Sequence, residues 1–228
     1  GAVSKFRELP NAADLQLTSL GVQLEGYTTN YRLNPVRGNE WQLQLTAGTR
    51  NIKKNNGILK LKDRQDPGFD YGRLYDSLQL NSYQLRIRST AVHFFPLGGL
   101  TTLKLGLDAG WVYSPRLFRN ELFQIGGYKL LRGFDEESIY ASHFLVAGME
   151  YRYLVGRNSR FYAFLDAGWV RNSATVQLAS SNYLSAGLGM TLQTKGGVFN
   201  IAVAAGKRSD LDLSLKQAKL HFGYVNYF

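Results

Sequence analysis

The chain has 228 residues, 44% of them hydrophobic, with a mean hydropathy of −0.23 and a formal net charge of +10. No apolar run reaches the ~20 residues of a membrane-spanning helix, which excludes a helical membrane protein. The sequence contains no Cys, which excludes a disulfide framework and a thiolate metal site. Tyr, Phe and Gly number 14, 13 and 24, and this abundance fits the aromatic girdles and close packing of a transmembrane β-barrel.

The positive charge does not indicate a nucleic-acid partner. Lys and Arg are scattered along alternating segments and in two loops, and they form no basic stripe on a helix. A polar lumen, solvated loops and contacts with lipid phosphates explain the charge more simply. We therefore expect no nucleic acid among the partners.

Residues 1–14 have a mixed composition, and we expect a tail or a weak first strand there. Residues 15–228 are expected to form one β-barrel domain. Its first extended segment, Leu15–Leu33, changes the phase of its apolar residues, which predicts a bulge or a break near Ser19. The apolar residues of the first phase are Leu15 and Leu17, and those of the second are Leu20, Val22 and Leu24.

Eight further segments alternate apolar and polar residues with the period of two that is typical of a β-strand. Their apolar centres lie at residues 41–47, 83–91, 103–111, 145–153, 161–169, 184–192, 199–205 and 220–224. With the first segment they make nine strands, whereas single-chain bacterial barrels have even numbers. The N-terminal residues would then add a tenth strand, or the first segment would lie partly outside an eight-stranded barrel.

Short and long connections alternate along the chain. Turns are predicted near residues 36, 97, 157 and 196, and loops at residues 51–77, 114–141, 171–181 and 207–217. Short turns on one side and longer loops on the other are typical of outer-membrane barrels. A soluble sandwich shares the alternation but does not explain this asymmetry. The sequence therefore predicts an all-β, antiparallel, up-and-down transmembrane β-barrel of about 8–10 strands.

The loop at residues 114–141 is too long for a tight hairpin and too apolar to lie in solvent. Its large apolar residues need cover, and its glycines permit sharp turns. The apolar residues are Phe123, Ile125, Tyr128, Leu130, Leu131 and Phe134, and the glycines are Gly126, Gly127 and Gly133. We expect this loop to fold into the barrel lumen with Arg132 at its tip.

Two carboxylates are predicted to face this loop. Phe164, Asp166 and Gly168 share one strand face at a spacing of two residues, and Glu150 projects inward from the preceding strand. Two carboxylates in a narrow lumen are costly unless a cation neutralises them. Arg132 is the candidate, because a guanidinium binds carboxylates in a planar fork and lies flat on an aromatic ring.

Leu131-Arg132-Gly133-Phe134, with the lead-in Phe123–Gly127, resembles the signature loop of the outer-membrane protein assembly and two-partner secretion superfamily. That superfamily includes the BamA and TamA insertases and the FhaC-type transporters. Its loop enters the lumen, where the Arg contacts an FxDxG strand motif and an acidic residue on the preceding strand. Phe164–Gly168 is similar to that motif, and Glu150 falls at the acidic position. The end of the chain, Tyr224–Phe228, resembles the aromatic signal by which such barrels are recognised for assembly.

The resemblance implies two sets of functional residues. A seam between the first and last strands, weakly hydrogen-bonded, would open laterally or template an incoming strand. The set that locks the loop in the lumen, here called the loop lock, is Arg132, Gly133, Phe134, Glu150, Phe164, Asp166 and Gly168. The set for the seam and the C-terminal signal is Phe222, Tyr224, Tyr227 and Phe228.

The resemblance covers about residues 31–228 and implies the outer membrane of a Gram-negative bacterium, or an organelle of bacterial origin. It implies a function in inserting outer-membrane proteins or translocating polypeptides. The implied partners are outer-membrane lipids and lipopolysaccharide, unfolded or secreted client proteins, and a second copy or a separate periplasmic partner. Family barrels are larger and follow periplasmic POTRA domains. The chain thus resembles a short member without POTRA domains, or the C-terminal part of a larger barrel.

We expect no enzyme activity, no metal and no cofactor. The histidines, His93, His143 and His221, form no Ser/His/Asp set, and metal-binding and phosphate-loop motifs are absent. The five Lys or Arg residues of Lys53–Asp66 would suit lipopolysaccharide phosphates, although such runs more often lie in solvent. The alternative to an assembly function is a small structural barrel or pore without a client, in which the loop lock only stabilises a plug.

Overall fold

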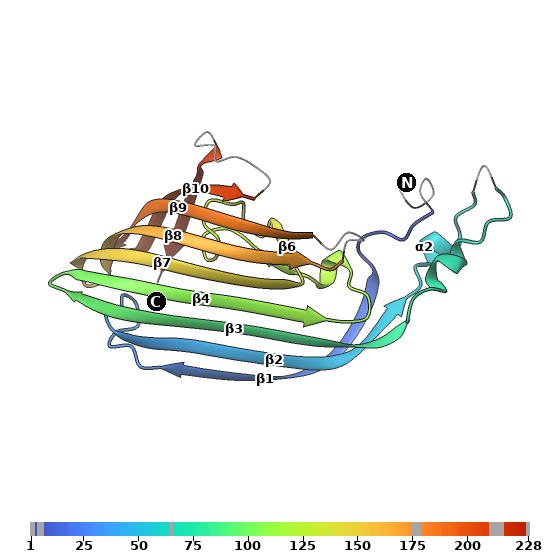
Figure 1. The fold of residues 1–228 in the computed structure, drawn as a ribbon, viewed down its shortest axis with the longest axis horizontal. Coiled ribbons are helices and arrows are strands. Elements are labelled where there is room, and N and C mark those ends of the chain that lie inside the picture. Colours follow the sequence, from blue (N-terminus) through green and yellow to red (C-terminus); the bar gives the residue numbers. More distant parts are fainter. Residues whose placement is uncertain (1–2, 4–6, 64–65, 175–178, 210–216, 227–228) are drawn as a thin grey trace.

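One antiparallel sheet dominates the computed structural model of the chain, which describes residues 3, 7–63, 66–174, 179–209 and 217–226 (Figure 1). The described residues form nine main strands in the order β1-β2-β3-β4-β7-β8-β9-β10-β11. Each of these strands pairs with its neighbour along the chain, which is an up-and-down arrangement. The predicted all-β antiparallel architecture is therefore confirmed.

The main strands coincide with the alternating segments of the sequence. They are β1 (Asp14–Tyr27), β2 (Gly38–Lys53), β3 (Asn81–Gly98), β4 (Thr101–Tyr113), β7 (His143–Gly156), β8 (Ser159–Asn172), β9 (Ala179–Thr194), β10 (Gly197–Arg208) and β11 (Lys219–Val225). The shorter elements are α2 (Asn56–Leu59), η1 (Tyr71–Tyr75), η2 (Arg119–Glu121), β5 (Phe123–Ile125) and β6 (Ile139–Ala141). No helix in the described part of the chain is both long and apolar enough to cross a membrane.

The two outermost strands, β1 and β11, form the edges of the sheet. Within the described residues, β1 pairs only with β2 and β11 pairs only with β10. The sheet is curved but open, as Figure 1 shows. The closure of this sheet into a barrel thus stays a prediction.

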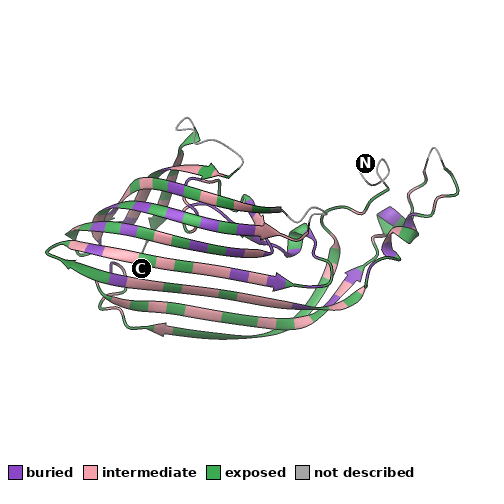
Figure 2. Cartoon of the chain, in the orientation of Figure 1, coloured by how far each residue is buried: buried purple, intermediate pink, exposed green. Residues whose placement is uncertain are grey.

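Buried and exposed residues alternate along β7 and β8, as the sequence pattern predicts (Figure 2). On β8, Leu165 and Trp169 point to the outer face and are each 41% exposed, whereas Phe164 and Asp166 are buried on the inner face. The paired positions continue this pattern on neighbouring strands, so apolar side chains form an exposed band across the outer face. A continuous apolar band of this kind is typical of a surface that contacts lipid.

The break expected near Ser19 is wrong. Strand β1 pairs with β2 in one continuous register, from Asp14 opposite Lys53 to Tyr27 opposite Glu40. Leu15 changes the apolar phase because it packs against a buried cluster at this end of the sheet, next to Ile52. An inward-facing apolar contact therefore explains the phase of Leu15 without an inserted residue, whereas Leu17, in the same phase, is 47% exposed.

The turn predicted at Pro96–Gly99 begins later than expected. Strand β3 continues to Gly98, and its register against β4 shifts between Pro96 and Gly98. Proline has no N–H to donate to the ladder, so it is tolerated at a bulge or at the end of a strand. The shift places Pro96 at such a position.

The predicted polar loop at residues 51–77 contains structure that the sequence analysis missed. Asn55 caps α2, accepting hydrogen bonds from the backbone N–H groups of Gly57 and Ile58 at 2.8 and 3.3 Å. The buried apolar cluster that Leu15 contacts forms here, and its buried members are Ile52, Ile58, Tyr71, Tyr75, Leu78 and Phe118. The apolar residues of the segment are too widely spaced to show a period, which is why the sequence indicated only a polar loop.

Candidate functional site

The long loop between β4 and β7 lies against the inner face of the sheet (Figure 1). Its lead-in is a short hairpin, because β5 pairs with β6 with Phe123 opposite Ala141. Gly126 and Gly127 follow β5 with φ angles of +106° and +107°. Glycine adopts such angles readily, whereas residues with a Cβ are strained there. The glycine pair therefore allows the chain to turn from the hairpin toward the inner face.

Apolar side chains of the loop and of the inner face share one core. Leu131, beside the arginine of the motif, is fully buried in it. The loop residues of this core are Leu117, Leu122, Phe123, Ile125, Leu131, Ile139 and Ala141, and the strand residues are Val112, Phe144, Val146 and Val170. Strands β4, β7 and β8 thus bury the apolar side chains of the loop, as the sequence analysis expected.

Arg132 contacts carboxylates on two adjacent strands. Its Nε and Nη2 donate to Oδ2 and Oδ1 of Asp166 on β8, at 3.0 and 2.8 Å. Its Nη1 donates to Oε2 of Glu150 on β7, at 2.8 Å. The backbone N–H of Arg132 also donates to Oδ2 of Asp166, at 3.1 Å. One guanidinium therefore joins the loop to both strands, using the fork geometry that lysine lacks.

These charges are shielded from water. The side chains of Arg132, Asp166 and Glu150 are 13%, 5% and 6% exposed. The guanidinium carbon of Arg132 lies 3.6 Å from the centroid of the Phe164 ring. Burial lowers the pKa of Arg132, but its hydrogen bond to Asp166 and the charges of both carboxylates outweigh burial and raise that pKa. The arginine thus stays charged, and removing it leaves the buried carboxylate of Asp166 without this partner.

The residues after Arg132 pack against β9 and β10. Gly133 has a φ of +97°, and a Cβ built on it would lie 2.9 Å from the carbonyl carbon of Ala205. The Phe134 ring meets the Tyr183 ring edge to face, with centroids 5.2 Å apart. Gly206 leaves room for this ring, since a Cβ there would lie 2.7 Å from Cζ of Phe134. Both glycines permit the close approach of the loop tip to the wall.

Gly168, the last residue of the FxDxG motif, leaves room for Leu131. A Cβ on Gly168 would lie 2.9 Å from Cδ2 of Leu131. Leu131 has a positive φ of +56° and no exposed surface, so the loop has little freedom to move away. The seven residues of the predicted loop lock therefore lie together, in contact with the loop or within it.

The predicted seam residues lie apart from the loop lock. Phe222 and Tyr224 are exposed on the outer face of β11. Both rings lie tilted against the ring of Phe199 on β10, with centroids 6.1 and 4.8 Å away. Tyr227 and Phe228, the other two residues of the predicted signal, lie outside the described residues.

A second buried ion pair, which the sequence analysis missed, holds the base of the loop. Nε of Arg50 on β2 lies 2.7 Å from Oε1 of Glu121 in η2, and Nη2 donates to Oε2 at 2.8 Å. Their side chains are 1% and 4% exposed. Nη1 of Arg50 also donates to the hydroxyls of Ser82 and Ser114, each at 3.1 Å. The loop is therefore bound to β2 at its base and to β7 and β8 at its tip.

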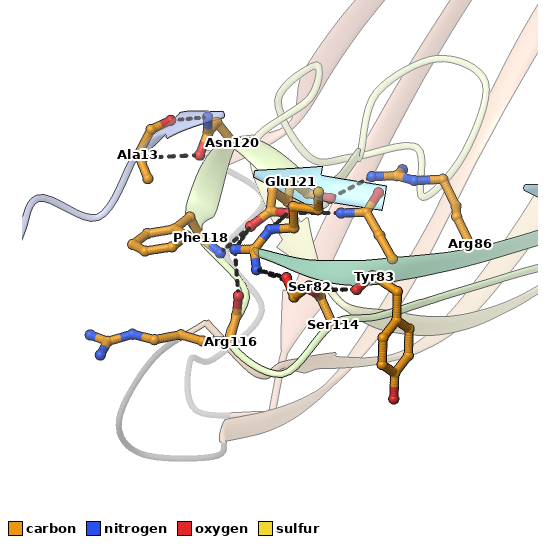
Figure 3. A network of polar contacts seen from close by, with 11 residues as sticks. Ala13, Ser82, Tyr83, Arg86, Ser114, Arg116, Phe118, Asn120 and Glu121 are labelled. Atoms are coloured by element: carbon orange, nitrogen blue, oxygen red, sulfur yellow. Dashed lines mark hydrogen bonds and ion pairs between the residues drawn. The ribbon is translucent and has the colours of Figure 1, made fainter. Parts of the chain in front are cut away.

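Figure 3 shows Glu121 at the centre of this second network. Its Oε2 accepts from the backbone N–H of Phe118 at 2.9 Å, and its Oε1 accepts from Nε2 of Gln84 at 2.8 Å. The alternation of β2 places Arg50 on the inner face, but no motif marks Glu121 within the loop. The sequence pattern therefore could not predict that Glu121 is the partner of Arg50.

The short turn between β1 and β2 contacts the other end of the inner wall. Nη1 of Arg160 donates to Oδ1 of Asn34 at 3.1 Å, and Nδ2 of Asn34 donates to the backbone carbonyl of Arg157 at 3.3 Å. Nε of Arg160 lies 3.8 Å from Oε1 of Glu150. Glu150 contacts Arg132 at the loop tip, and through Arg160 it is also connected to Asn34 in the β1–β2 turn. Asn34 and Arg160 are 126 positions apart in the chain.

An antiparallel meander with an apolar outer face and an arginine loop fastened inside it is the arrangement expected of an outer-membrane assembly or secretion protein. The chain matches the Omp85 superfamily domain over residues 7–226. It belongs to the Omp85 superfamily, which confirms the resemblance drawn from the motifs. This superfamily is, in general, one of outer-membrane proteins that assemble or translocate other proteins. No curated protein matches the chain.

Proposed function

We propose that this protein is a transmembrane β-barrel of the outer membrane that aids the insertion of outer-membrane proteins or the translocation of polypeptides, without enzymatic chemistry. The observation that carries the proposal is the binding of Arg132 to Asp166 and Glu150. These contacts fasten the loop to the inner wall. Membership of the Omp85 superfamily supports an assembly or translocation function in general.

The two edge strands of the sheet, β1 and β11, suggest how a client strand would be accepted. Strands β1 and β11 each have one side that pairs with no described strand. Free N–H and C=O groups along a strand edge template an added strand, so a weak seam between β1 and β11 would accept or release a client strand. The fastened loop keeps β7 and β8 rigid while the seam opens. Outer-membrane lipids, lipopolysaccharide and unfolded or secreted clients are the partners, with a second copy or a periplasmic protein assisting.

A client-folding assay tests this function. An unfolded outer-membrane barrel is added to liposomes that contain wild type, Arg132→Ala or no protein, and its folding is followed over time. We expect wild type to accelerate folding and Arg132→Ala to lose that acceleration. Lys195→Ala, which removes an exposed cation from the β9–β10 turn, is the matched control and should match wild type. Absence of acceleration by wild type would overturn the assembly function.

A structural barrel or pore is the second candidate, and the two buried ion pairs favour it. Arg50 with Glu121 and Arg132 with Asp166 fix the loop on the inner wall at two points, as a permanent plug requires. Steady single-channel conductance without client-folding activity would support this candidate. A native mass well above one chain in detergent would instead indicate that the barrel acts as an oligomer.

A further inference from the structure

A cavity of about 310 Å³ lies on the inner face beside Arg132. Strands β3, β4, β7 and β8 and loop residues 128–132 line it. Its charged lining residues are Lys104, Asp108, Lys129, Arg132, Glu150, Arg152, Arg160 and Asp166. Five cations thus face three carboxylates, which leaves the lining with a formal charge of +2.

Two of the three carboxylates of the cavity, Asp166 and Glu150, are already engaged. Arg132 occupies both oxygens of Asp166 and Oε2 of Glu150. Oε1 of Glu150 accepts from Nε of Arg152 at 2.8 Å and lies 3.8 Å from Nε of Arg160. Lys104 lies directly opposite Glu150 in the register of β4 and β7, which adds a further cation to the same carboxylate. Glu150 therefore faces more cations than its single charge neutralises.

Arg152 shows the resulting deficit of acceptors most clearly. Its side chain is 5% exposed, and its Nη1 has no hydrogen-bond partner among the residues that the structure describes. A buried guanidinium N–H without an acceptor costs stability, so it marks a position where an acceptor belongs. Because Arg152 lines the cavity, an anion held there supplies that acceptor.

We propose that this cavity binds a phosphate group between Arg152, Lys104 and Arg160. A phosphate group carries up to two charges, which match the +2 of the lining, and its oxygens project in several directions toward separate cations. A carboxylate has one charge and two oxygens in a plane, so it would satisfy fewer of these donors. The same chemistry is offered by free phosphate and by a phosphomonoester lipid headgroup.

Calorimetric titration of the full chain in detergent tests the site. Sodium phosphate is titrated against sodium chloride at matched ionic strength, and dihexanoyl phosphatidic acid is titrated separately. We expect saturable binding with one phosphate group per chain. Lys104→Gln and Arg152→Gln should each weaken binding about tenfold or more, because each removes a charged donor. Lys195→Gln makes the same change of charge on an exposed turn and should bind as wild type does.

The wild-type titrations decide the proposal even if the Arg152→Gln variant does not fold. Binding of inorganic phosphate but not of the lipid supports a small-ion site, and binding of the lipid alone supports a headgroup site. Saturable binding of neither would overturn the proposal. An equal loss of affinity in Lys195→Gln and Lys104→Gln would also overturn it, since the cavity would then contribute nothing beyond net charge.

Discussion

Gly133, at the tip of the loop, donates its backbone N–H to Nε2 of His221 at 3.2 Å. The two residues are 88 positions apart, and His221 lies on the edge strand β11. Gly133 directly follows Arg132, whose side chain fastens the loop to β7 and β8. This hydrogen bond connects the residues that hold the loop with the strand that we propose to form the seam. An ion pair lies beside it, in which Nζ of Lys219 on β11 is 2.7 Å from Oδ1 of Asp135 in the loop.

His221→Ala should loosen the edge strand without releasing the loop. It removes a neutral hydrogen bond worth about 1 kcal/mol, while the contacts of Arg132 stay intact. We expect faster amide hydrogen exchange in β11 and unchanged exchange in β7 and β8. His93→Ala, on β3, is the control and should leave β11 unaffected. Unchanged exchange of β11 in His221→Ala would show that this hydrogen bond does not support the seam.

Gly133→Ala should displace the loop tip. The added Cβ would lie 2.9 Å from the carbonyl carbon of Ala205 at a φ of +97°. Gly98→Ala is a matched control, because Gly98 has a φ of +100° and nothing within 4 Å of a Cβ. Both variants carry the ~1–3 kcal/mol of an unfavourable φ, but only Gly133→Ala adds the clash. Limited proteolysis should cut the loop faster in Gly133→Ala alone, and equal cutting in both would refute the steric account.

Phe164→Leu should weaken the hold on Arg132 while it keeps an apolar side chain. The guanidinium carbon lies 3.6 Å from the centroid of the Phe164 ring, and such cation–π contacts contribute about 0.5–2 kcal/mol. Phe161→Leu removes a ring from the outer face of the same strand. Urea unfolding in detergent should show the larger loss for Phe164→Leu. A larger loss for Phe161→Leu would place the stabilisation on the outer face.

Arg50 and Glu121 should behave as one unit in a double-mutant cycle. Arg50→Ala and Glu121→Ala each leave a buried charge unpaired, which costs about 3–5 kcal/mol. The double variant leaves neither charge, so its loss of unfolding free energy should be well below the sum of the two single losses. Chemical denaturation of the three variants and wild type measures this coupling. Strict additivity would show that the two residues stabilise the fold independently.

The strands and the contacts of Arg132 with Asp166 and Glu150 were predictable because each leaves a local or spaced pattern in the sequence. Period-two alternation gives the strands, and the spacing of Phe164, Asp166 and Gly168 puts them on one face. The resemblance to the superfamily's loop motif then predicts that Arg132 contacts this strand face. The continuous pairing of β1 was not predictable, because the contact that shifts its apolar phase at Leu15 comes from a distant segment.

The parts that escaped prediction depend on contacts between residues far apart in the chain. Glu121 sits in a short 3₁₀ turn without a motif, and only the folded loop brings it to Arg50, 71 positions earlier. Asn34 was predicted to lie in a turn, but its contact with Arg160 spans 126 positions. Neither alternation nor composition contains information about such pairs, since each residue type is ordinary where it stands.

The measurement that tests the account most directly is a double-mutant cycle on Arg132 and Asp166, with the rate of client folding in liposomes as the readout. Arg132→Ala, Asp166→Ala and the double variant remove the same bidentate contact. The account predicts that each single variant slows client folding and that the double variant is no slower than Arg132→Ala, while Lys195→Ala keeps the wild-type rate. Wild-type rates in the single variants, or effects that simply add in the double variant, would contradict the claim that this contact makes the loop functional.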